Sequence, residues 1–115
     1  MRRLVDLENT LRNAELLSVV FKYERYTKNI KQESSVEISL VKFEKQVINL
    51  RLTGVQKVDL CDDYMCSSIS HVKAIEDGNT ISISLDPYKE DIDYIDERDN
   101  FIFSFTEYQL VEEGL

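Results

Sequence analysis

The strongest constraint on the fold is a regular alternation of apolar and polar side chains in residues 80–85 and 101–110. In the first segment, isoleucine and leucine alternate with serine. In the second, phenylalanine at 101, 103 and 105 shares one side, and Ser104 and Thr106 lie on the other. A period of two residues is typical of a β-strand with one face against a core and the other toward water. Both segments are therefore predicted to be strands.

The rest of the chain adds further strands and one helix. The predicted elements are a helix at residues 2–13 and strands at residues 15–24, 35–43, 47–60, 67–76, 80–85 and 101–110. Gly54 indicates a bend within one long strand, and residues 25–34 are polar and unpatterned, which indicates a loop. Short connections favour antiparallel neighbours. We therefore predict an α+β, mainly β fold, with an N-terminal helix and a six-stranded, twisted or half-closed antiparallel meander.

Length and composition indicate one domain covering residues 1–115, with 43% apolar and 31% charged residues. No segment has the apolar length of a membrane helix, and the first residues lack the apolar stretch of a signal peptide. With two cysteines, Cys61 and Cys66, a disulfide framework is not expected. We therefore predict a cytoplasmic protein that does not bind a membrane.

Charge is distributed unevenly along the chain. Residues 1–57 hold 11 Lys/Arg and 7 Asp/Glu, a net charge of +4, whereas residues 58–115 hold 3 and 15, a net charge of −12. Such an acidic half would repel a phosphate backbone and attract a basic partner. The prediction is therefore a basic protein partner and no nucleic acid, although an acidic surface also serves solubility alone.

The most acidic segment is residues 86–100, which contain seven of the 22 carboxylates and only two cations. Two tyrosines and two isoleucines lie among these charges, a mixture that is typical of a protein-binding surface. The same apolar side chains would also serve to anchor a long loop to its own domain. The predicted partner-binding residues are Asp62, Asp63, Tyr88, Glu90, Asp91, Asp93, Tyr94, Asp96, Glu97 and Asp99.

Patterns that carry catalysis or metal binding are weak in this sequence. His71 is the single histidine, and no nucleophile or orienting carboxylate can be assigned to it from the sequence. Cys61 and Cys66 are too far apart for a typical zinc pair. The acidic segment lacks the glycine that a calcium-binding EF-hand loop requires. We therefore predict no enzyme activity, no metal and no cofactor.

Three short segments resemble small bacterial immunity proteins of polymorphic toxin systems. They are Leu-Arg-Asn-Ala-Glu-Leu at 11–16, Val-Lys-Phe at 41–43 and Leu-Thr-Gly-Val at 52–55. Members of that family typically open with Leu-His-Asp-Ala-x-Leu and carry Phe-x-Gly-Val, so Arg12-Asn13 and Leu52-Thr53 depart from the pattern. The resemblance implies a cytoplasmic, non-enzymatic protein that occludes a secreted toxin domain, and a basic partner such as a nuclease would suit the acidic half.

Two alternatives remain open from the sequence. One is a structural or assembly domain that forms a homodimer through exposed strand edges or through the tail after Leu110. The other is an enzyme in which a pocket brings His71 close to Asp62 or Cys61.

Overall fold

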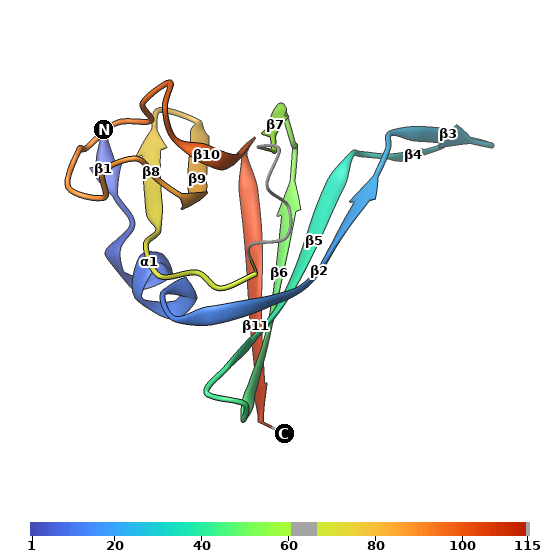
Figure 1. Ribbon diagram of the computed structural model, residues 1–115. Helices are drawn as coiled ribbons and strands as arrows, with labels where there is room; N and C mark the ends of the chain where they lie inside the picture. The colour runs from blue at the N-terminus through green and yellow to red at the C-terminus, as the bar shows by residue number, and fades with distance from the viewer. Residues whose placement is uncertain (61–66, 115) are drawn as a thin grey trace.

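The computed structural model describes residues 1–60 and 67–114, which form eleven strands and one short helix (Figure 1). The elements are β1 (Arg2–Arg3), α1 (Val5–Leu11), β2 (Ala14–Lys22), β3 (Arg25–Thr27), β4 (Ile30–Gln32), β5 (Ser35–Lys42), β6 (Gln46–Thr53), β7 (Lys57–Asp59), β8 (Lys73–Asp77), β9 (Thr80–Asp86), β10 (Asn100–Phe105) and β11 (Glu107–Gly114). All strand pairs are antiparallel. The mainly β, antiparallel prediction is confirmed, whereas the count of six strands is wrong.

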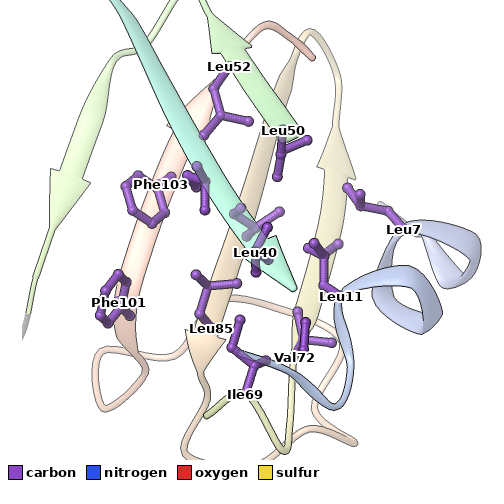
Figure 2. Close-up of a cluster of buried hydrophobic side chains, with 14 of the residues drawn as sticks. Leu7, Leu11, Leu40, Leu50, Leu52, Ile69, Val72, Leu85, Phe101 and Phe103 are labelled. Carbon is purple, nitrogen blue, oxygen red and sulfur yellow. The ribbon is translucent and has the colours of Figure 1, made fainter. Parts of the chain in front are cut away.

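Three sheets organise these strands. A five-stranded sheet has the order β1-β8-β9-β10-β7, a four-stranded sheet has the order β11-β6-β5-β2, and β3 and β4 form a separate hairpin. One hydrophobic cluster joins the inward faces of both large sheets and the helix. In Figure 2, Leu40 from the four-stranded sheet lies near Leu85 of the five-stranded sheet and Leu11 of the helix. The core thus uses the apolar positions of the predicted alternation.

The two large sheets meet at a corner where two segments of the chain leave one sheet and enter the other. β6 is followed by β7 in the five-stranded sheet, and β10 is followed by β11 in the four-stranded sheet. Thr106 N–H donates to the Thr53 carbonyl (3.1 Å), and Gln56 N–H donates to the Ser104 carbonyl (2.8 Å). β6 pairs with β11 before this corner, and β7 pairs with β10 after it. Gly54, at the bend, has a φ of +63°, which side chains other than glycine rarely adopt.

The strands on either side of this corner correct four predictions. The single bent strand at residues 47–60 is two strands in different sheets, and residues 101–110 are likewise divided, at Thr106. β11 continues to Gly114, through most of the segment predicted to be a tail. The strand predicted at residues 47–60 pairs with the one predicted at 101–110 instead of the one at 67–76. The strand order is therefore not that of a simple meander.

A second junction lies at the start of β2. Leu16 N–H donates to the Ser67 carbonyl (2.7 Å), and Ile69 N–H donates to the Ala14 carbonyl (2.9 Å). Residues 67–69 therefore run along the first part of β2, and the chain reaches the five-stranded sheet only at Lys73. The strand predicted at residues 67–76 thus joins the five-stranded sheet only from Lys73, six residues later than predicted.

The N-terminal helix is shorter than predicted. α1 covers Val5–Leu11, and β1 precedes it by pairing with β8. Leu7 and Leu11 are buried in the core, and Asn13 ends the segment with a φ of 69°. No helix among the described residues is long and apolar enough to cross a membrane.

The segment predicted to be a loop at residues 25–34 forms the hairpin β3–β4, which we call the arm. Lys28 and Asn29 adopt positive φ values at its tip, as a tight hairpin turn requires. All residues of both strands are exposed, which explains why no apolar alternation marks them in the sequence. Figure 1 shows the arm projecting away from the body beyond the end of β2.

Candidate functional site

The acidic loop, residues 86–100, connects β9 to β10 on the outer face of the five-stranded sheet. Val72 and Ala74 belong to the core, so the alternation of β8 directs Lys73 toward the opposite face. The Lys73 side chain has no exposed surface there. Its ammonium group donates to the Tyr94 carbonyl (2.9 Å) and to the Asp99 carboxylate (2.9 Å). The loop therefore covers a cation that rises from the sheet beneath it.

Asp99 holds the loop together from within. Its side chain is completely buried, and besides Lys73 it accepts hydrogen bonds from two backbone N–H groups of the same loop. Tyr88 N–H donates to Oδ1 (2.7 Å), and Asp96 N–H donates to Oδ2 (2.8 Å). One carboxylate thus fixes the start and the end of the loop to a single buried cation. A buried ion pair with its remaining acceptor positions occupied is a geometry that a protein interior tolerates.

The N-terminal segment holds the middle of the loop. The Arg3 guanidinium donates to the Glu90 carbonyl (2.8 Å) and pairs with the Asp93 carboxylate (3.0 Å). Arg3 also pairs with the buried Glu8 (2.6 Å), whose carboxylate accepts the Ala74 N–H (2.9 Å). Burial lowers the pKa of Arg3, but its hydrogen bonds to the carboxylates of Glu8 and Asp93 raise that pKa by more. Arg3 therefore stays charged and links the helix, the sheet and the loop.

Glu90 lies between two cationic or ionisable partners. Arg12 contacts Glu90 Oε1, and His71 Nδ1 lies 2.9 Å from Oε2. Partial burial favours the neutral acid, but the hydrogen bonds from His71 and Arg12 outweigh it and lower the pKa of Glu90. Glu90 is therefore ionised at neutral pH and compensated within the chain.

The end of the loop carries a stacked arrangement of Asp96, Arg98 and Tyr88. Arg98 donates to Asp96 through its side chain (2.9 and 3.0 Å) and through its backbone N–H (2.8 Å). The Arg98 guanidinium also lies 4.0 Å from the centre of the Tyr88 ring, within the range of a cation–π contact. These hydrogen bonds hold the pKa of Asp96 well below its usual range.

Acidification is expected to destabilise the fold through Asp96. A carboxylate whose pKa is lower in the folded chain stabilises it fully above the ordinary aspartate pKa of about 4, and this stabilisation is lost as the pH falls below that value. Urea unfolding at neutral pH and at about pH 3 measures the loss. Asp96→Asn should lose less stability on acidification than the wild type. Glu113→Gln, an exposed control on β11, should behave as the wild type does; an unchanged loss in Asp96→Asn would contradict this assignment.

Several predicted binding residues do not lie on an outer surface. Asp96 and Asp99 are buried and bind the loop's own backbone, which corrects the expectation that both form part of an exposed acidic rim. A count of charges along the sequence does not distinguish a solvated carboxylate from one that caps backbone N–H groups. Asp62 and Asp63 lie outside the residues that the structure describes.

The outer surface of the loop presents a smaller set of groups. Tyr88 and Tyr94 are 48% and 51% exposed. Asp91 and Glu97 are exposed and form no ion pair with any described residue. Glu90 and Asp93 are compensated by the arginines of the N-terminal segment. The local excess of free negative charge is therefore much smaller than the sequence count suggests.

Sequence reasoning missed Lys73, Arg3 and Arg12, which fix the loop. Lys73 had a signal, because it is a lone cation between Val72 and Ala74 in a segment predicted to be a strand. The two arginines had none, since their partners in the loop lie more than seventy residues away along the chain.

The groups considered for catalysis do not form a constellation in the described part of the chain. His71 lies outside β8 with an exposed side chain, and its ring contacts Glu90. No group of three or more histidine, cysteine, aspartate or glutamate side chains is placed to hold a metal within residues 1–60 and 67–114. The alternative that combined His71 with Asp62 or Cys61 falls on residues outside that part.

Comparison with known proteins gives no match: no family model, no curated protein and no solved structure is similar to this chain at the level that would indicate relationship. The resemblance to immunity proteins therefore stays a prediction.

Proposed function

We propose that this chain is a non-enzymatic protein-binding module of immunity type, and that the outer surface of the acidic loop contacts a basic partner. One observation carries the proposal. The Lys73–Asp99 pair fixes the loop from its buried side, while Tyr88 and Tyr94 remain half exposed on the other side. The loop thus presents two aromatic side chains on a surface that is already fixed from within.

A loop that is already ordered before its partner arrives favours a high affinity for that partner. A flexible loop loses conformational entropy when a partner immobilises it, at a cost of about 0.5–1.5 kcal/mol for each rotamer-rich side chain. Here Tyr88 is already stacked on Arg98, and the backbone of Tyr94 is already bonded to Lys73. Tyrosines add large contact area with few rotatable bonds, and they are enriched where proteins bind one another.

Charge then determines the partner's chemistry. Asp91, Glu97 and, at the start of the loop, Asp86 are exposed carboxylates that form no ion pair with any described residue, and the chain as a whole has a net charge of −8. A basic partner would be attracted over a distance and then meet the tyrosines. Because Glu90, Asp93 and Asp96 are already compensated, we expect the salt dependence to be modest.

An affinity experiment with matched variants tests this function. The wild-type chain and each variant are immobilised, and the proteins that each one retains are compared by quantitative mass spectrometry. A protein retained by the wild type is then purified, and the kinetics of its binding to the wild type and to each variant are measured. Tyr94→Ala should weaken its binding about tenfold. The double reversal Asp91→Lys/Glu97→Lys should slow association and flatten its dependence on salt.

Controls separate the loop from the rest of the surface. Tyr26→Ala removes a tyrosine that is 72% exposed on the arm, and Glu112→Lys/Glu113→Lys makes the same charge change on β11. Both controls should bind as the wild type does. The proposal is wrong if no retained protein distinguishes the loop variants from these controls. For the immunity function, co-expression of the chain should also relieve growth inhibition caused by the retained protein.

A further inference from the structure

The two edges of the four-stranded sheet differ in charge. β11 forms one edge and carries Glu107, Glu112 and Glu113. β2 forms the other edge and carries charge only at Glu15 and Lys22, with uncharged residues between them. Charged side chains along an edge strand prevent pairing with another chain. The β11 edge is therefore protected in the usual way, and the β2 edge is not.

Only the second part of the β2 edge is open. Residues 67–69 bond to the backbone of Ala14 and Leu16, so the start of the edge is occupied. No described residue pairs with the outer side of β2 from Ser18 to Lys22. Val20 lies at the middle of this open stretch and is 44% exposed. An unpaired strand edge with exposed apolar side chains is a template for another strand.

We propose that two copies of this chain pair through β2, antiparallel and about a two-fold axis at Val20, so that two four-stranded sheets become one continuous sheet. The position of the axis follows from the length of the open edge, because symmetric pairing of Ser18 with Lys22 uses the whole stretch. This interaction is independent of the acidic loop, which lies on the other large sheet.

The pairing is self-complementary. Opposite residues in an antiparallel pair share a face, so the axis places Val20 against itself and Phe21 against Val19 of the second copy. Aromatic and β-branched residues make favourable cross-strand pairs. Outside the open stretch, the exposed Tyr23 follows Lys22 and the exposed Leu17 precedes Ser18 at the bulge of β2, so the antiparallel arrangement brings these two side chains to the same end of the interface. No position in the ladder brings two like charges together.

Charge complementarity extends the match to the arm. Residues 22–33, which include the arm, carry four cations and two carboxylates, in contrast to the net charge of −8 for the whole chain. Arg25 begins the arm beyond one end of the open stretch, and Glu15 precedes the bulge of β2 beyond the other end. Because the two copies run antiparallel, Arg25 of one copy lies at the same end of the interface as Glu15 of the second copy. Glu15 there lines a shallow hollow together with Phe43 and Glu44, which would receive the basic arm.

Sedimentation of the full chain over a wide range of concentrations tests the proposal. The wild type should form a dimer. Val20→Lys places two ammonium groups opposite each other at the axis and should weaken the dimer about tenfold or more. Val111→Lys is the matched control, since Val111 is 50% exposed on the opposite edge strand, and it should dimerise as the wild type does. Arg25→Glu and Glu15→Arg should each weaken the dimer, and their combination should restore it.

Hydrogen exchange gives a second readout in the wild-type chain. Backbone amides between Ser18 and Lys22 that point outward should be protected at high concentration and lose that protection on dilution. A chain that stays monomeric at every concentration overturns the proposal, and so does a dimer that Val20→Lys leaves intact or that Val111→Lys weakens equally. Binding of an extended segment of a different protein at β2 by a monomeric chain would likewise refute it.

Discussion

Replacing Lys73 with methionine is expected to lower the free energy of unfolding by about 3–5 kcal/mol. The substitution removes the cation but leaves the Asp99 carboxylate, whose side chain has no exposed surface. An uncompensated buried charge is among the most destabilising consequences of a single substitution. Urea unfolding measures the change. Lys45→Met, at an exposed position in the turn after β5, is the control and should change stability by less than about 0.5 kcal/mol.

A double-mutant cycle identifies the cause. Asp99→Asn removes the charge but keeps one oxygen that accepts a hydrogen bond from the loop, so Lys73→Met/Asp99→Asn should be more stable than Lys73→Met alone. This comparison stays informative even if the single variant is largely unfolded. Strictly additive effects, or a Lys73→Met chain as stable as the Lys45→Met control, would show that the pair does not hold the loop.

Replacing Gly54 with alanine should cost about 2–4 kcal/mol, because two effects combine at the corner between the sheets. The backbone has a φ of +63°, and an added Cβ would overlap the Thr106 side chain, lying 3.1 Å from its Cβ. Gly78→Ala is a matched control, since Gly78 has a φ of +64° and its added Cβ would meet open space. Gly78→Ala should lower the free energy of unfolding only through the unfavourable backbone conformation, by about 1–2 kcal/mol.

The difference between the two alanine variants isolates the crowding at the corner. Thr106→Gly in the Gly54→Ala background should recover part of the loss, because it removes the overlapping atoms. Equal destabilisation at Gly54 and Gly78 would indicate that the close approach of the strands at the corner contributes nothing. Urea unfolding of the four chains provides these values.

Strands that bury one face could be predicted from the sequence. β5, β6 and β9 alternate clearly, because each directs apolar side chains into the core. The arm could not be predicted, since both of its faces are solvated and no burial pattern marks it. The division of residues 101–110 into two strands at Thr106 could not be predicted, because apolar residues continue on both sides of the corner. A chain can bend at such a point without glycine or proline.

The candidate site shows a different limit. The sequence indicated correctly that residues 86–100 are a long acidic connection, but not which carboxylates turn inward. Asp99 satisfies backbone groups that exist only once the loop has folded, whereas Asp91 does not. The partners of the loop come from Lys73 and from the N-terminal arginines. Their proximity depends on sheet order, which the local pattern does not contain.

The proposed binding surface requires a loop that is ordered from within before any partner binds. Amide hydrogen exchange of the isolated chain measures this at Tyr88 and Asp96, whose N–H groups donate to Asp99. We predict that both amides exchange far more slowly than the exposed amides at residues 28–29 at the tip of the arm, and that Lys73→Met removes the difference. Exchange at Tyr88 and Asp96 as fast as at the arm tip in the wild type would contradict the account.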